Sequence, residues 1–476
     1  MWTMIPKMLT KIHDASMDIL RSVGVAFKSD EALEIFRKAG LKIDGKAVFL
    51  SEKDVRKALD SAPSHFRMTA RNREKSVDIG GDDFALAPGY GASFIVSADG
   101  RQRRTVKEDY DIFCKLVQTS EAITVCGFLM AEPSDLSRKT AHLDMLFSNM
   151  VLCDKPYMGC PVSKAGARDS LNMAGMLWGG KDKLKEKPVT ISLITPLSPL
   201  CYTAETSEAI IELAGCGQAL IFGALLMAGA TASMKLAGAL VQQNAELLAG
   251  ITLTQLVRPG SPVVMGGSSS VLDMRTGGLS MGAPQLHRIT AATIQMAKFY
   301  NLPARGGCAL TDAHFPDAQA GYESALSLST AVNAGSNFIL HAAGMLGAYA
   351  EMSFEKFIID EELCRLVLAS RRPLEVSDAA IDVKMIKEVG IGGEYLSHPA
   401  TVELCRKGFF VSRIANRQGY AQWHESGSKH INQKATEILY QRLDAYEKPD
   451  IDPQLEQDLL SYIIARKNGG RTAMAI

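Results

Sequence analysis

Short apolar segments alternate with longer segments of helical pattern through the middle of this chain. The apolar segments span residues 122–130, 155–163, 188–200, 218–227, 261–273, 303–312 and 337–344. They recur about every 30 to 40 residues, which is the spacing that parallel strands joined by crossover helices require. This alternation predicts an α/β protein built on a parallel sheet.

An eighth, weaker segment at residues 352–357 would complete a (β/α)8 TIM barrel. The alternative is an open doubly wound sheet, which normally shows a GxGxxG turn after its first strand. Here the sequence AEPSDLSR follows residues 122–130, and no GxxxxGK[ST] motif occurs. We therefore expect the barrel, and nucleotide binding has no support from its usual motifs.

The regions on either side of the barrel differ in character. Residues 1–115 predict helices, with Ser29 as an N-cap, and a β-hairpin that turns at Asp99-Gly100, a strong hairpin signal. The barrel is expected to occupy residues 116–376. From residue 377 to 476, charged helical patterns predict a C-terminal helical region that packs on the barrel.

Composition restricts the partners. Lys+Arg and Asp+Glu are both 52, so no overall charge favours nucleic acid or an anionic membrane. Residues 213–234 carry no charge, yet glycines and Gln218 interrupt them, which favours a buried strand and loop over a membrane span. The nine cysteines include no CxxC pair, and the N-terminus lacks a signal-peptide pattern. We expect a cytoplasmic protein.

Functional side chains of a βα barrel follow the carboxyl ends of the strands. This rule selects residues in the segment LTDAHFPDAQAGYE and in the segments on either side of it along the barrel. Structural alternatives stay open, because Asp317 could cap the next helix and His341 could be a core histidine. A zinc site from Cys160, Cys308, His314 and His341 is conceivable, but no HxxxH or HExxH spacing supports it. No GxSxG elbow indicates a hydrolase.

Four segments together resemble the trimethylamine:corrinoid methyltransferase superfamily. They are KIHDASMDILRSVGVAF, MTARNREKSVDIGGDDFALAPGYGASF, LTDAHFPDAQAGYE and YLSHPATVELCRKGFFVSRIANRQGYAQW. The resemblance implies a barrel that passes a methyl group from an amine to the Co(I) of a separate corrinoid protein. Ordinary residues stand near Phe315 and Pro316, where the founding enzymes carry pyrrolysine. The chain therefore resembles the non-pyrrolysine branch, whose members demethylate glycine betaine, proline betaine or carnitine.

The resemblance also implies a site of few catalytic groups. A quaternary ammonium leaves as a neutral amine without a general acid, so positioning and aromatic faces are the main needs. We predict three catalytic residues, which help to attract the ammonium or to bind a carboxylate: Asp312, His341 and Glu351. We predict six substrate-binding residues: Tyr90, Phe94, His314, Phe315, Tyr349 and Phe354. Arg305 is expected to point into the barrel or to pair with an acid.

No metal and no tightly bound cofactor is expected, since the corrinoid would come on its own protein. The predicted partners are that corrinoid protein, a small quaternary amine and further copies of the chain. Two alternatives stay open. One is a zinc-dependent corrinoid methyltransferase that uses another methyl donor, and the other is a non-catalytic betaine-binding protein.

Overall fold

The computed structural model describes residues 4–405 and 408–469. At its centre, seven parallel strands form one sheet in the order β6-β18-β17-β14-β12-β10-β9. Their bounds are Ala85–Leu86 (β6), Tyr157–Met158 (β9), Thr190–Ile194 (β10), Ala219–Ala224 (β12), Val263–Gly267 (β14), Ala304–Gly307 (β17) and Phe338–Leu340 (β18). The predicted α/β class with a parallel sheet is confirmed.

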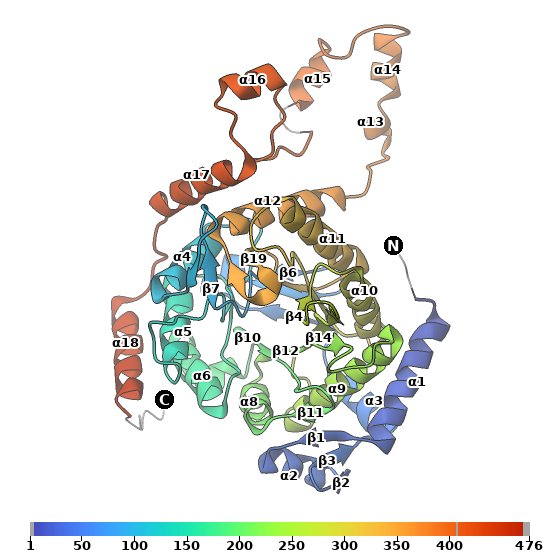
Figure 1. Cartoon of the computed structure of the whole chain (residues 1–476), viewed down its shortest axis with the longest axis vertical. Helices are drawn as coiled ribbons and strands as arrows, with labels where there is room; N and C mark the ends of the chain where they lie inside the picture. The colour runs from blue at the N-terminus through green and yellow to red at the C-terminus, as the bar shows by residue number, and fades with distance from the viewer. Residues whose placement is uncertain (1–3, 406–407, 470–476) are drawn as a thin grey trace.

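Helices surround this sheet (Figure 1). They are α4 (Lys107–Gln118), α5 (Ala141–Leu152), α6 (Lys164–Trp178), α8 (Ala204–Gly215), α9 (Leu236–Val257), α10 (Pro284–Phe299), α11 (Ala318–Ala334) and α12 (Phe354–Ser370). Because helices cover its outer face, β12 is buried at all six positions. This strand lies in the uncharged stretch of residues 213–234, as predicted. Among the described helices, none combines the length and apolar character needed to cross a membrane.

The two edge strands of the sheet share a neighbour. Cys126 forms a parallel bridge with Tyr157 in β9, while the amides of Thr124 and Val125 donate to the carbonyl of Leu86 in β6, at 2.9 and 3.0 Å. Residues 123–126 thus lie between β9 and β6. The segment 122–130 was expected to be a full strand, but only this short extended portion pairs.

The eighth strand predicted at residues 352–357 is wrong. Glu351–Met352 (β20) pairs with a different sheet, and Phe354 begins α12. The seventh strand of the central sheet is instead β6, which lies in the predicted N-terminal region. Sequence patterns missed it because only two residues pair, within the Gly- and Pro-containing stretch FALAPGYG.

The N-terminal region contains the expected helices, α1 (Pro6–Ser22), α2 (Asp30–Lys38) and α3 (Glu52–Ser61). Ser29 caps α2, as predicted, by accepting from the amide of Ala32. The hairpin at Asp99-Gly100 is also confirmed, with Phe94–Val96 (β7) antiparallel to Gln102–Arg104 (β8). β20 pairs with β7, and Met345–Leu346 (β19) pairs with β20, so this four-stranded sheet lies beside the central one.

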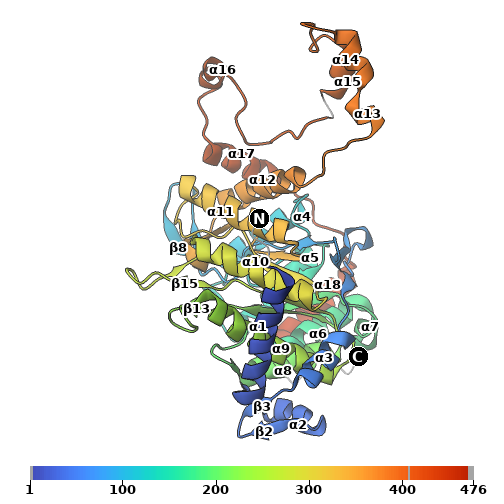
Figure 2. The same cartoon turned by 90° about the vertical axis from the view of Figure 1, so that its right-hand side faces the viewer.

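The C-terminal region divides into two parts (Figures 1 and 2). Helices α17 (Ile431–Asp444) and α18 (Pro453–Lys467) pack on the body, α17 along α12 and α4 and α18 along α5 and α6. Between α12 and α17 the chain projects outward, and we call residues 373–411 the arm. It contains α13 (Asp378–Ile381), α14 (Val383–Val389) and α15 (Pro399–Leu404). Residues 406–407 of the arm lie outside the described residues.

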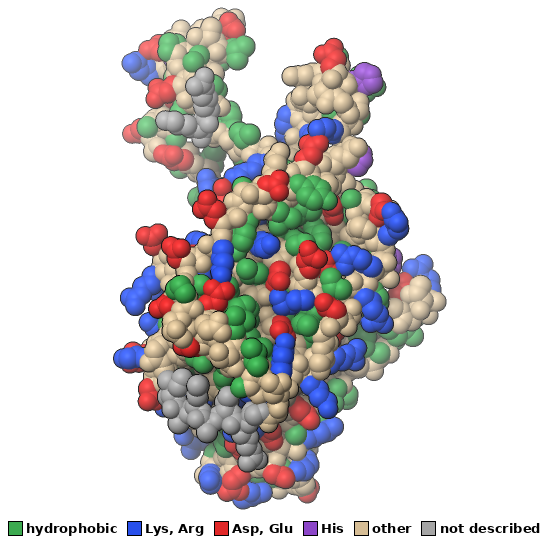
Figure 3. Space-filling model, turned by 90° about the vertical axis from the view of Figure 1, so that its left-hand side faces the viewer, with side chains coloured by type: hydrophobic (Ala, Val, Ile, Leu, Met, Phe, Trp, Pro, Cys, Tyr) green, Lys and Arg blue, Asp and Glu red, His purple; other side chains and the backbone are tan. Residues whose placement is uncertain are grey.

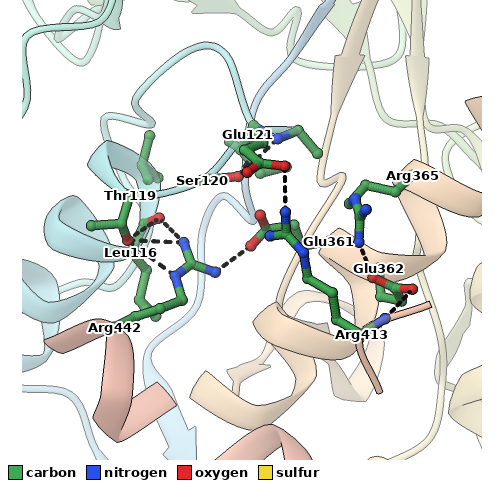
Figure 4. Close-up of polar contacts among 12 residues, drawn as sticks. Leu116, Thr119, Ser120, Glu121, Glu361, Glu362, Arg365, Arg413 and Arg442 are labelled. Carbon is green, nitrogen blue, oxygen red and sulfur yellow. Dashed lines mark hydrogen bonds and ion pairs between the residues drawn. The ribbon is translucent and has the colours of Figure 1, made fainter. Parts of the chain in front are cut away.

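Arginines fix α17 and the segment that directly follows the arm to the body (Figure 4). Arg413 donates to Glu121 at 2.7 Å through its side chain and to Glu362 at 3.1 Å through its amide. Arg442 pairs with Glu361 and also donates to Thr119. The body itself carries Lys, Arg, Asp and Glu interspersed on the face shown in Figure 3.

Candidate active site at the carboxyl edge of the sheet

The carboxyl ends of β6 and β18 lie next to each other and bring two predicted site residues together. The amide of His341 donates to Pro88 at 3.2 Å, and that of Gly89 donates to Ala343 at 2.8 Å. Tyr90 follows directly after Gly89. The strand ends therefore hold Tyr90 and His341 at one edge of the sheet, where a parallel α/β fold places its ligands.

Arg305 points to the inner side of the sheet. A Cβ on the neighbouring Gly306 would lie 2.8 Å from Ala331 of α11, so Gly306 faces the helices. Successive strand residues face opposite sides, and Arg305 therefore faces inward. In register, Arg305 is opposite Gly266 and Gly266 is opposite Gly223. A Cβ on Gly223 would lie 3.7 Å from Nη1 of Arg305, which places the guanidinium across two glycines.

The charge of Arg305 has no visible counterion. The residue is only 3% exposed, and its Nε has no hydrogen-bond partner. Within the described residues, no carboxylate forms an ion pair with it. Burial lowers the pKa of Arg305 from its ordinary value, while Tyr349 and Cys308 oppose that change. A buried cation without a partner is costly, so this is the electrostatic feature of the site that calls for explanation.

Two rings lie beside this cation. The centroids of His341 and Tyr349 are 4.9 Å apart, and both backbones are left-handed, with φ of 64° and 82°. Burial, and then the charge of Arg305, hold the pKa of His341 well below its ordinary value, so the imidazole is neutral. Burial raises the pKa of Tyr349 to about 12, although Arg305 opposes the rise. The two rings thus present uncharged faces.

Several polar atoms around these rings are buried without a partner. They are Nδ1 of His341 and the hydroxyls of Tyr349 and Ser268, although these two hydroxyls lie near enough to each other for Ser268 to lower the pKa of Tyr349. Ser268 follows β14, and its hydroxyl lies 2.1 Å from the position that a Cβ on Gly307 would take. Buried polar atoms are nearly always hydrogen-bonded in native proteins. Their concentration around Arg305 therefore indicates a place where a polar ligand binds.

Four predicted residues form a separate group beside the hairpin of β7 and β8. Glu351 is buried and accepts from Gln102 at 2.6 Å and from Nδ1 of His314 at 3.1 Å. Phe94 is opposite Glu351 in register. Phe315 packs against a small apolar cluster that includes Val96. Each of these residues therefore belongs to the hairpin or contacts it, directly or through Glu351.

Asp312 and Phe354 make contacts elsewhere. The carboxylate of Asp312 accepts from the hydroxyl of Ser280 at 2.8 Å and from the amides of Met281 and Gly282 at 2.6 and 2.9 Å, and so holds that loop in place. The ring of Phe354 lies 4.8 Å from that of Phe113, between α12 and α4. Their predicted roles in binding and catalysis stay predictions.

The structure decides one alternative left open by the sequence, the role of Asp317, and it gives the orientation of Arg305. Asp317 caps α11 by accepting from the amide of Ala320 at 3.0 Å. No three His, Cys, Asp or Glu side chains come together as a metal centre in residues 4–405 and 408–469. Of its two expected orientations, Arg305 takes the inward one, and Ser268 joins it. The sequence offered one signal for the role of Arg305. It is a charged residue in an otherwise apolar segment, directly before Gly306-Gly307.

Comparisons with known proteins give a consistent result. The model of the family described as trimethylamine methyltransferase (MTTB) matches residues 2–471. Glycine betaine methyltransferase of Desulfitobacterium hafniense (strain Y51) is 41% identical over 96% of this chain and 95% of that protein. Proline betaine:corrinoid methyltransferase of Eubacterium limosum is 33% identical over 94% of each. The L-carnitine:corrinoid methyltransferase of Eubacterium limosum is 31% identical over 92% of each.

Among solved structures, the monomethylamine methyltransferase (MtmB) of Methanosarcina barkeri is similar in fold. Its TM-score is 0.51 at 10% identity, and the match covers 93% of this chain and 98% of that chain. At this identity the similarity concerns the fold alone.

Proposed function

Because this chain belongs to the trimethylamine methyltransferase family, we propose that it transfers a methyl group from a betaine-type quaternary amine to the Co(I) of a separate corrinoid protein. The names of three relatives, which act on glycine betaine, proline betaine and carnitine, support this substrate class. The observation that carries the proposal is the pair of uncharged rings, His341 and Tyr349, at the carboxyl edge of the sheet.

The proposed reaction is a nucleophilic displacement. The Co(I) electron pair forms a bond to one methyl carbon, while the carbon–nitrogen bond breaks and its electrons stay on nitrogen. A neutral tertiary amine leaves, so no side chain has to donate a proton. The chain's own task is to hold the methyl group in line with the approaching cobalt. The faces of aromatic rings bind a quaternary ammonium well. Tyr90, which follows the neighbouring strand β6, offers a further ring at this edge of the sheet.

We also propose that the sheet closes into the (β/α)8 barrel expected from the sequence. Seven parallel strands are present, and residues 123–126 contact both edge strands, β9 and β6. The eighth position would then belong to this short segment. In a barrel of parallel strands, the active site opens at the carboxyl ends of the strands. The corrinoid protein would therefore bind over that opening and supply the corrinoid there.

Purified protein mixed with reduced free cobalamin tests the function. Glycine betaine, proline betaine, carnitine, butyrobetaine and trimethylamine are added separately, and the loss of the Co(I) absorbance is followed. We expect methyl-cobalt with a betaine and none with trimethylamine. Binding of betaine without methyl-cobalt formation would instead favour the non-catalytic betaine-binding protein. One zinc ion per chain, found by metal analysis and needed for activity, would favour the zinc-dependent alternative.

We further propose that copies of the chain associate, and the exposed apolar side chains of the arm support this. The cytoplasmic location and the division at residues 115/116 and 376/377 stay predictions.

A further inference from the structure

The guanidinium of Arg305 keeps its charge, because arginine is too strong a base to lose its proton in a protein. It therefore cannot avoid the cost of burial by losing a proton, as a lysine could. The carboxylates near the same edge of the sheet are used elsewhere. Asp312 holds residues 280–282, Glu351 accepts from His314 and Gln102, and Glu323 accepts from Thr311 at 2.6 Å and from the amide of Asp312 at 2.9 Å.

Glycines on the adjoining strands leave room for the side chain of Arg305 itself. Gly266 and Gly223 leave the adjoining strands without side chains, and a Cβ on Gly266 would lie 2.7 Å from that of Arg305. Nε of Arg305 is buried and unpartnered, and the hydroxyls of Ser268 and Tyr349 are buried with no hydrogen-bond partner other than each other. Together these groups offer more hydrogen-bond donors than the described residues can satisfy.

We propose that Arg305, with the hydroxyls of Ser268 and Tyr349, binds the carboxylate of a zwitterionic quaternary amine and makes the enzyme select amines that carry one. This inference rests on the proposed function, and it assigns a residue to the substrate's second charge. A carboxylate on a guanidinium forms two parallel, charge-assisted hydrogen bonds, which are stronger than neutral ones. The ligand thus supplies the counterion that Arg305 lacks.

The same placement orients the substrate. Arg305 is opposite Phe338 in register, which is three residues before His341. Three residues of strand correspond to about 10 Å, so the Cα of Arg305 lies well inside the edge at which His341 stands. Attraction draws the carboxylate inward, and repulsion between Arg305 and the ammonium keeps the methyl groups toward the strand ends. The methyl group is then presented to the side from which the cobalt would approach.

The test replaces Arg305 with methionine, which keeps the chain length and removes the charge, and with lysine, which keeps the charge without the paired donors. Each variant is titrated calorimetrically with glycine betaine and with choline, which carries a hydroxymethyl group where betaine carries its carboxylate. We expect Arg305→Met to weaken betaine binding by roughly 10- to 100-fold and to leave choline binding nearly unchanged. Arg305→Lys should retain part of the preference for betaine.

Arg56, an exposed arginine on α3, provides the matched control, since Arg56→Met should leave the preference unchanged. Thermal melting of every variant shows whether it is folded. If a folded Arg305→Met protein prefers betaine over choline as strongly as the unaltered protein does, the proposal is wrong. Calorimetry does not depend on methyl transfer, so betaine binding that requires Arg305 without methyl-cobalt formation would contradict only the proposed reaction.

Discussion

Two lysine–carboxylate pairs with the same spacing lie in very different surroundings. In α12 of the body, Lys356 pairs with Asp360 four residues later, and both side chains are 1% exposed. In α14 of the arm, Lys384 pairs with Glu388 four residues later, at 3.7 Å, with side chains 88% and 49% exposed. The lysine and its carboxylate partner are four residues apart in both helices. The two pairs differ in burial. The fold depends on the buried pair in α12, whereas water can replace the exposed pair in α14.

The same contrast extends to the apolar side chains. In the body they fill the space between sheet and helices, whereas much of the arm exposes them to solvent. The large apolar residues of the arm with exposed fractions between 45% and 110% are Leu374, Val376, Ile381, Val383, Ile386, Ile391, Tyr395, Leu396, Val402, Leu404, Phe409 and Val411. Exposed apolar side chains in such number along one segment are typical of a surface that binds protein.

The largest difference between body and arm is expected for the two lysines. Lys356→Met removes one partner of a fully buried pair and leaves Asp360 with the amide of Gly344 as its partner. Such a change costs about 3–5 kcal/mol of the free energy of unfolding. Lys384→Met should change it very little, because an exposed pair contributes little. Urea unfolding of both variants measures this. Equal losses would show that the arm's helix is as well packed as α12.

A smaller effect is expected where α18 is fixed to the body. Asp169 is 2% exposed and accepts from Tyr462 at 2.6 Å, from Arg466 at 2.8 and 3.0 Å, and from His142 at 2.9 Å. Burial would raise the pKa of Asp169, but these bonds outweigh it and lower the pKa to about 2.

This pKa predicts how stability depends on pH. The folded value lies below the unfolded value of about 3.9, so the stabilisation is complete above that value and is lost as the pH falls toward 2. The loss should be about 2 kcal/mol, and Asp169→Asn should remove it at neutral pH as well. Unfolding measured from pH 5 down to pH 2 tests this. An Asp169→Asn protein with the same acid dependence as the unaltered chain would contradict the assignment.

Local sequence predicted the parts of this molecule that local contacts determine. The Asp99-Gly100 turn has its two strands within a few residues, and Ser29 caps the helix that follows it directly. Long apolar segments such as 218–227 predicted buried strands because their length and composition suffice. β6 was missed, since two paired residues give no periodicity to detect.

The site was harder to predict because separate strands build it. Arg305 lies across Gly266 and Gly223, which are 39 and 82 residues away along the chain. Only the register of the three strands shows that glycines lie beside the side chain of Arg305 and that no carboxylate pairs with it. His341 and Tyr349 were predicted from their positions near strand ends, which is a property of the fold. By contrast, nothing local to Asp312 indicated that residues 280–282 would satisfy its carboxylate.

The arm's apolar surface gives the next prediction, which concerns association. Ile391→Glu and Leu396→Glu place charges on side chains that are 110% and 76% exposed. If this surface is buried against a second copy, each change should weaken association by about 1–2 kcal/mol and leave the unfolding of the single chain unchanged. Analytical ultracentrifugation over a range of concentrations measures the mass.

Leu326→Glu, at an exposed position of α11 in the body, is the control and should leave the mass unaltered. If the chain without substitutions has the mass of one copy at every concentration, the arm does not mediate self-association. Protection of the arm on addition of the corrinoid protein would then identify that protein as its partner.

The smallest predicted effect separates two neighbouring phenylalanines at the end of the arm. The ring of Phe410 lies 5.3 Å from the guanidinium carbon of Arg365 in α12, whereas Phe409 is 85% exposed. Phe410→Ala should lower the free energy of unfolding by about 0.5 kcal/mol, since cation–π contacts at partly exposed sites contribute this much. Phe409→Ala should leave that energy unchanged and should instead weaken association, because its ring meets solvent in a single copy.

Denaturation at low protein concentration measures the first effect, and sedimentation at high concentration measures the second. A loss of unfolding free energy in both variants would place the boundary between body and arm before Phe409 rather than after it.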